Sequence, residues 1–161
     1  MITPDTEIEL PPIYCPLEPA VHPRVHAVER RADDWIRASG MCADDTECRW
    51  VIATHSVNFY GRFAPFADDD RLLATALWVY WGFAFDDARC DNGPLSDRPD
   101  RFAALAGRVQ RAVEGPTAAA GGERLIPPLQ RIVAGFRAIG TPLQARRFGA
   151  AHRAWLSGVT W

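Results

Sequence analysis

The sequence LLATALWVYWGFAFDDARCD, residues 72–91, decides the fold class of this chain. Residues 72–85 are almost all apolar and lie between Arg71 and Asp86. This run is too short to cross a bilayer, which takes about 20 apolar residues. Patterns that alternate apolar and polar residues, as strands do, are scarce in the rest of the chain. The stretch therefore predicts a buried helix in an all-α fold.

Apolar residues recur at helical spacing on both sides of this run. Gly40 predicts the end of the first helix, and Asp44 or Asp45 can cap the second, which continues until Gly61 and Pro65 break it. The expected helices cover residues 24–39, 44–60, 68–89, 99–113 and 123–139, and a last one follows Pro142 and is still helical at residue 161. Asp68, Asp69 and Asp70 stand where the third helix begins, so we expect them to cap it and not to form a site.

Residues 1–23 differ from the rest because they contain prolines 4, 11, 12, 16, 19 and 23. Proline at this density removes amide donors and disfavours a helix. We therefore expect an extended, Pro-rich N-terminal arm that packs over a helical domain formed by residues 24–161. A chain of 161 residues with 48% hydrophobic residues can bury the core of one such domain.

Composition excludes several classes of partner. The net charge of −2 supplies no broad basic surface for nucleic acid. The chain opens without the basic and apolar stretch of an export signal, and its four cysteines are scattered, so we expect a reducing cytoplasm. Cys15, His22 and His26 are poor zinc ligands by this pattern, since no CxxC pair accompanies them.

The carboxylates Asp86, Asp87 and Asp91 follow the apolar run directly. A carboxylate near a low-dielectric interior is costly unless it is paired, protonated or bound to a cation. Mg²⁺ prefers oxygen ligands and is commonly bound by one or two carboxylates together with substrate phosphates. If the helix continues, Asp87 and Asp91 share a face and Asp86 is displaced by one residue's rotation. The motif therefore suits diphosphate chemistry, and the alternative is that these side chains simply face water.

A calcium-binding EF-hand loop is a rival interpretation of the same residues. With Gly93 as its invariant glycine, Ala88 and Cys90 would stand at the first and third ligand positions, where oxygen ligands are required. This interpretation is excluded.

The residues LPPIYCP at 10–16, then His22-Pro23, Trp35 and residues 81–91 follow the order found in bacterial class I terpene synthases. The whole chain resembles the N-terminal part of that family, which implies part of a class I terpenoid synthase helical bundle. The resemblance implies that Asp86 binds Mg²⁺, which holds the diphosphate of a linear allylic substrate, most commonly farnesyl diphosphate. Asp87 and Asp91 match the remaining acids, although DDxxxD is one residue longer than the commoner spacing.

Ionising an allylic diphosphate leaves a carbocation, which needs surroundings that neither add to it nor hydrate it. Aromatic faces attract cations and carry no nucleophile. Phe83, one helical turn before Asp86, and Phe59 from the preceding helix are therefore the candidate cavity residues. Trp78 and Trp81 are expected to serve packing instead.

The family's second metal-binding motif, Asn-Asp-x-x-Ser-x-x-x-Glu, has no counterpart in this sequence. Asn58 and Asn92 are the chain's asparagines, and neither is followed by Asp. We therefore expect the chain alone to be weakly active or inactive, either as a truncated remnant or as one half of a split enzyme. Exposed apolar faces would then favour self-association, which light scattering tests.

Two further alternatives stay open. A prenyl-chain-elongating synthase would share the fold, but it should carry a second aspartate-rich motif. A metal-free helical interaction module predicts that Asp86→Ala changes only stability, and titration with Mg²⁺ and diphosphate separates it from an enzyme.

Overall fold

The computed structural model describes residues 11–91, 93–115, 117 and 119–159. The described residues contain helices and no strand, so the all-α prediction is confirmed. The elements in chain order are α1 (Val25–Ser39), α2 (Asp45–Ile52), α3 (Ser56–Phe63), α4 (Asp69–Phe85), the π-helix η1 (Asp86–Asp91), α5 (Pro99–Glu114), α6 (Ile126–Ile139) and α7 (Pro142–Gly158).

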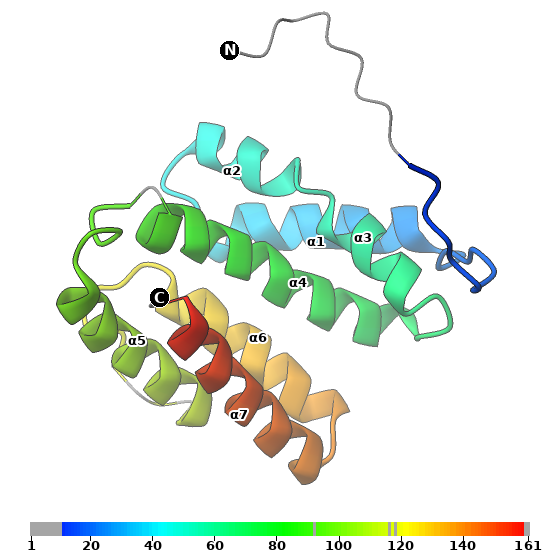
Figure 1. Cartoon of the computed structure of the whole chain (residues 1–161). Helices are drawn as coiled ribbons and strands as arrows, with labels where there is room; N and C mark the ends of the chain where they lie inside the picture. The colour runs from blue at the N-terminus through cyan, green and yellow to red at the C-terminus, as the bar shows by residue number, and fades with distance from the viewer. Residues whose placement is uncertain (1–10, 92, 116, 118, 160–161) are drawn as a thin grey trace, which may run out of the picture.

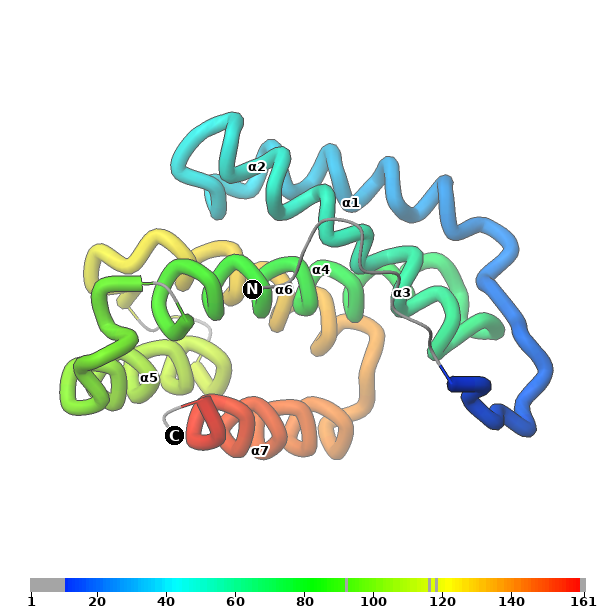
Figure 2. The backbone as a smooth tube through the Cα atoms, turned by 45° about the horizontal axis from the view of Figure 1, so that its top comes forward, coloured from blue at the N-terminus to red at the C-terminus, as the bar shows by residue number. Residues whose placement is uncertain are grey.

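Helix α4 lies in the middle of the bundle (Figures 1 and 2), with α1, α2 and α3 on one side and α5, α6 and α7 on the other. Its side chains Tyr80, Trp81 and Phe85 are fully buried. The indole N–H of Trp81 donates to the Leu125 carbonyl at 2.7 Å, which satisfies the polar atom of the largest core residue. The apolar run of the sequence is therefore the buried helix that its composition predicts.

The starts of α2 and α4 follow the expected capping chemistry. Asp68 caps α4 by accepting from the Arg71 backbone N–H at 2.8 Å, and Asp44 accepts from the N–H groups of Thr46 and Glu47. Both side chains satisfy amide donors that have no partner in the first helical turn. The capping role predicted for residues 68–70 is confirmed for Asp68.

The prediction of a single helix over residues 44–60 is wrong, because the helix is interrupted between Ile52 and Ser56. His55 adopts a left-handed conformation with φ of 48°, and the Thr54 hydroxyl donates to the Val51 carbonyl at 2.9 Å. A local side-chain bond of this kind competes with the helical ladder, and the break turns α3 onto α4.

Three other boundaries differ from expectation. The α-helical part of α4 ends at Phe85 and not near Arg89, because a π-helix follows. Helix α6 begins at Ile126 and not at residue 123, since its two prolines fit only in the first turn. Helix α7 ends at Gly158, so Val159 is no longer helical.

The N-terminal arm is not packed over the body in the part that the structure describes, since residues 11–19 are exposed. Residues 1–10 lie outside the described part. The arm is attached at His22, which is 3% exposed, donates its backbone N–H to the Gly61 carbonyl and bonds the Ala67 carbonyl through its ring. None of the described helices combines the length and apolar character needed to span a bilayer.

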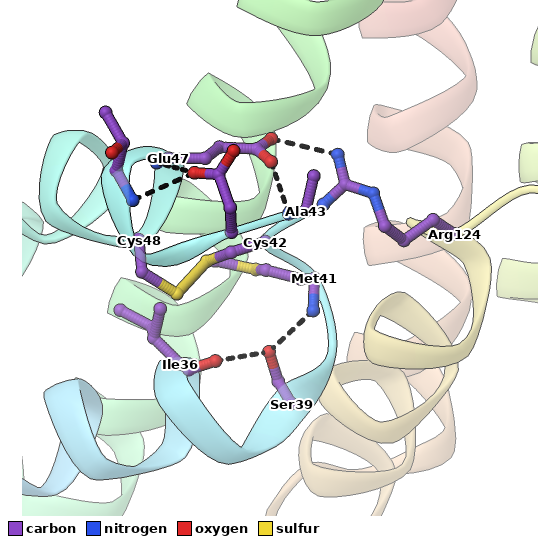
Figure 3. Close-up of a disulfide and its surroundings, with 10 residues drawn as sticks. Ile36, Ser39, Met41, Cys42, Ala43, Glu47, Cys48 and Arg124 are labelled. Atoms are coloured by element: carbon purple, nitrogen blue, oxygen red, sulfur yellow. Dashed lines mark hydrogen bonds and ion pairs between the residues drawn. A yellow bond between two sulfur atoms is a disulfide. The ribbon is translucent and has the colours of Figure 1, made fainter.

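The cysteines are not four separate thiols. Cys42 and Cys48 form a disulfide that closes the loop between α1 and α2 (Figure 3), while Cys15 and Cys90 are free. Beside it, the Ser39 hydroxyl donates to the Ile36 carbonyl at 2.7 Å and accepts from the Met41 N–H. The pair was not predicted, although Cys42 in the loop and Cys48 on α2 are only six positions apart, because the fold of that loop brings the two thiols together and no spacing pattern marks them.

Candidate active site

The three carboxylates Asp86, Asp87 and Asp91 all stand on the π-helix η1 that continues α4. In an α-helix residues turn by about 100° each, so Asp86 and Asp91 would lie roughly 140° apart on different faces. A π-helix bonds residue i to residue i+5, which places Asp91 close to one turn above Asp86. The expectation that the motif continues as an α-helix is therefore wrong, and the wider turn brings Asp91 towards Asp86.

Asp86 is half-buried, whereas Asp87 and Asp91 are exposed. Burial raises the pKa of the Asp86 carboxyl above its usual range, and the charges of Asp91 and Asp87 raise it further, against a hydrogen bond from the Cys90 thiol that lowers it. Burial, the hydrogen bond to Asp86 and the charges of Asp86 and Asp91 raise the pKa of Cys90 to about 12. The first aspartate thus carries unfavourable like-charge and desolvation energy, which a bound cation would relieve.

Phe83 and Asp87 lie together in a groove between α2 and the end of α4, with a volume of about 490 Å³. Trp50 of α2, which is 72% exposed, lines the same groove, so an aromatic wall and a carboxylate face one space. Phe83 therefore lines a groove, and its role as a cavity residue stays a prediction.

Phe59 lies apart from that groove. Its ring, 51% exposed, contacts Phe63 and Tyr60 of its own helix at centroid distances of 4.8 and 5.6 Å. The structure therefore brings Phe83 and Asp87 together and leaves Phe59 on a separate aromatic surface of α3.

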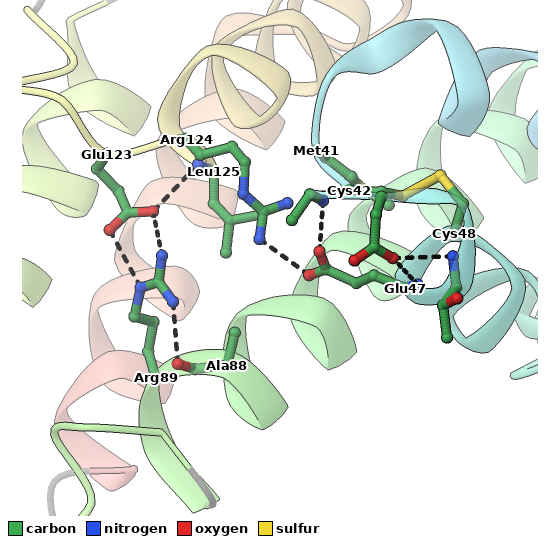
Figure 4. Close-up of polar contacts among 12 residues, drawn as sticks. Met41, Cys42, Glu47, Cys48, Ala88, Arg89, Glu123, Arg124 and Leu125 are labelled. Atoms are coloured by element: carbon green, nitrogen blue, oxygen red, sulfur yellow. Dashed lines mark hydrogen bonds and ion pairs between the residues drawn. A yellow bond between two sulfur atoms is a disulfide. The ribbon is translucent and has the colours of Figure 1, made fainter.

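A polar network that was not predicted from the sequence joins Arg89 of η1 to the loop that precedes α6 (Figure 4). Arg89, inside the π-helix, donates to both carboxylate oxygens of Glu123 at 3.2 and 3.0 Å. Glu123 also accepts from the Leu125 N–H at 3.2 Å. Next to it Arg124 donates to Glu47 at 2.9 Å.

The ionisation of Glu123 reflects these contacts. Burial raises the pKa of its carboxyl, but the hydrogen bonds from Arg89 and the Leu125 N–H and the two arginine charges outweigh burial, so the pKa lies below its usual range. No motif points to Glu123 in the sequence, because its partner is 34 positions away.

The donor set fits a hard cation more closely than a soft one. Within the described part of the chain, no group of three or more His, Cys, Asp or Glu side chains converges as a complete metal cage. Mg²⁺ does not require one, since it keeps several waters and takes one or two carboxylates together with phosphate oxygens. Asp86, Asp87 and Asp91 are the residues of η1 whose carboxylate oxygens could contribute to such a partial set.

No family model matches the chain, but a search of curated proteins finds relatives that are named as synthases. It is 66% identical over 156 residues to spiroviolene synthase of Streptomyces violens, a match that covers 96% of this chain and 44% of that protein. It is 33% identical to phomopsene synthase of Allokutzneria albata, covering 97% of this chain and 45% of that one.

Solved structures agree with these relatives. The crystal structure of SVS_A2, a protein from ancestral sequence reconstruction, is 70% identical and superposes with a TM-score of 0.92, covering 95% of this chain and 47% of that one. The chain thus spans less than half the length of the curated relatives and solved structures that it matches.

Proposed function

Because this chain belongs to the bacterial terpene synthase family, we propose that it forms the diphosphate-binding end of a Mg²⁺-dependent class I terpene cyclase site. The observation that carries the proposal is the cluster of Asp86, Asp87 and Asp91 on a π-helix at the end of a buried helix. A capping or solvated role does not explain why Asp86 is half-buried beside two other carboxylates.

The chain's own residues would act at both ends of the substrate. Asp86 and Asp91 would bind Mg²⁺, which neutralises the departing diphosphate when it is bound. Phe83 would present an aromatic face, which stabilises positive charge without adding to it. Asp87, the third predicted metal ligand, lines the same groove as Phe83.

Farnesyl diphosphate is the substrate we propose within the class of linear allylic diphosphates. Two relatives, (+)-T-muurolol synthase of Streptomyces clavuligerus and 4-epi-cubebol synthase of Streptosporangium roseum, are named as cyclising farnesyl diphosphate. Phe59 would contribute to the cavity only if a further segment covered the surface of α3, since its ring is half exposed here.

A second candidate is that the chain supplies one part of a split site, or is an inactive remnant. The sequence contains no Asn-Asp pair for the second metal motif, and large aromatic side chains such as Phe63 and Trp50 are exposed at 69% and 72%. In that case cyclisation requires another polypeptide that carries the missing motif.

The test is incubation of the purified chain with Mg²⁺ and farnesyl diphosphate, followed by gas chromatography with mass detection. Geranyl and geranylgeranyl diphosphate are tested in parallel. A cyclic product that needs Mg²⁺ and disappears in Asp86→Asn supports the proposal. No product from the chain alone, but product when it is co-expressed with the part of spiroviolene synthase that it does not match, identifies the split site. No product and no Mg²⁺-dependent diphosphate binding in either case refutes the complete site and the split site, and it leaves the inactive remnant.

A further inference from the structure

The conformation of η1 needs an explanation, because π-helical turns are rare and occur mostly as single-turn bulges at functional sites. The change from α to π begins at Asp86, whose backbone N–H is directed to the carbonyls of both Gly82 and Phe83. After the turn the chain passes so close that a Cβ at Gly93 would lie 2.3 Å from the Ala88 carbonyl oxygen. The chain therefore packs closely against the turn where it leaves it.

The contact that ties this turn to another part of the fold is the Arg89–Glu123 ion pair. Both guanidinium bonds reach separate oxygens of one carboxylate, a geometry that fixes orientation as well as distance. The two side chains are only 22% and 10% exposed, so water screens the pair weakly. Arg89 also donates to the Ala88 carbonyl at 3.0 Å, inside the turn itself.

Glu123 is itself held in place. Gly121 and Gly122 precede it with φ of 58° and 79°, a backbone that side chains rarely adopt. Its carboxylate also accepts from the Leu125 N–H, and the Leu125 carbonyl accepts the indole of Trp81. The loop at residues 123–125 thus makes hydrogen bonds with Trp81, which stands in α4 before the aspartates. It also bonds Arg89, which stands in η1 between Asp87 and Asp91.

We propose that the Arg89–Glu123 ion pair is a positioning element for the aspartates: it holds residues 86–91 in the π-helical form, which turns Asp91 towards Asp86. The DDxxxD spacing separates these two acids by five positions, and a turn bonded from i to i+5 suits that separation where an α-helix does not. The consequence for Mg²⁺ rests on the proposed function. Glu123 contacts no ligand in this role and acts through Arg89.

Two measurements on the whole chain test this. Hydrogen–deuterium exchange of the peptide containing residues 86–91 reports the turn directly, without metal. Calorimetric titration with MgCl₂ and inorganic diphosphate reports its consequence. The variants are Glu123→Gln, which keeps the shape but removes the charge, and Arg89→Lys, which keeps the charge but cannot make both parallel bonds. Asp69→Asn is the control, because it breaks the 2.9 Å pair with Arg24 at the other end of α4.

Glu123→Gln is expected to speed exchange in residues 86–91 and to weaken Mg²⁺ binding by about 10-fold or more, as loss of a supporting contact around a metal site usually does. Arg89→Lys should have an intermediate effect on exchange and on Mg²⁺ binding. Asp69→Asn should match wild type in both measurements. Unchanged exchange at residues 86–91 in both Glu123→Gln and Arg89→Lys overturns the positioning role. If wild type and Asp86→Asn are equally unable to bind Mg²⁺ with diphosphate, the proposed function fails, while the exchange result still decides the positioning role.

Discussion

Lowering the pH from 7 to 5 is expected to destabilise the fold by about 2 kcal/mol through one side chain, His152 of α7. This imidazole is 2% exposed, and its Nδ1 lies 3.0 Å from the Gln110 amide oxygen, which accepts the ring proton. Among the described residues its Nε2 has no hydrogen-bond partner. Aromatic rings surround it at centroid distances of 5.6–6.1 Å, from Trp78, Trp81, Phe148 and Trp155.

Burial lowers the pKa of His152 from 6.5 to about 4, because this apolar surrounding offers no partner for a second proton. Between those two values the unfolded chain binds the proton and the folded chain does not, so stability rises with pH across this window. The contribution is fully present above 6.5 and is lost as the pH falls towards 4. Linkage over this shift gives a loss of stability of about 2 kcal/mol at pH 5 and almost no loss at pH 7.

The assay is urea unfolding of wild type and His152→Gln at pH 7 and pH 5, followed by tryptophan fluorescence and circular dichroism. Wild type should lose about 2 kcal/mol more than the variant between the two pH values, a midpoint difference of about 1 M urea for a small domain. The remaining histidines are the same in both proteins and cancel in the comparison. Equal pH dependence in wild type and variant would show that His152 is not held neutral by burial.

Three further predictions concern the fold. Reducing Cys42–Cys48, or replacing both with Ser, should lower the free energy of unfolding by about 2 kcal/mol; urea unfolding with and without dithiothreitol checks this, and reductant should have no effect on the Ser variant. Thr141→Ala removes the cap of α7 and should cost about 1 kcal/mol, with an exposed substitution such as Arg146→Ala as the thermal-melting control. Leu129→Ala truncates a fully buried side chain of α6 and should cost about 2–5 kcal/mol by chemical denaturation; a loss below 1 kcal/mol would contradict its place in the core.

Much of the helical architecture was predictable because the signals are local. The apolar run ending at Phe85 and the cap at Asp68 depend on residues within one or two turns of each other. The break at His55 was not predictable by the same rules. Residues 44–60 keep helical spacing throughout, and only the packing of α3 on α4 and α1 shows why the chain must turn there.

The candidate site was predictable to a similar degree. The run of carboxylates after an apolar helix pointed to Asp86, Asp87 and Asp91, and the structure groups them on one short element. The two aromatic candidates lie in different places: Phe83 lines a groove with Asp87, while Phe59 contacts other rings of α3. Arg89 and Glu123 could not be chosen, because a lone arginine inside an acidic motif and a glutamate after two glycines have no signature of their own.

The amino-acid sequence by itself determined the all-α class, the buried central helix and the acidic end of that helix, because periodicity, capping and charge act over a few neighbouring residues. Only the tertiary structure decided the π-helical form of residues 86–91, the Cys42–Cys48 pair and the approach of Glu123 to Arg89. These features depend on backbone geometry at single residues and on contacts between distant segments. The Arg89–Glu123 contact exists only once α4 and η1 have packed against the loop that precedes α6, and the Cys42–Cys48 pair exists only once the loop before α2 has folded back on that helix, so no pattern of residue types specifies either.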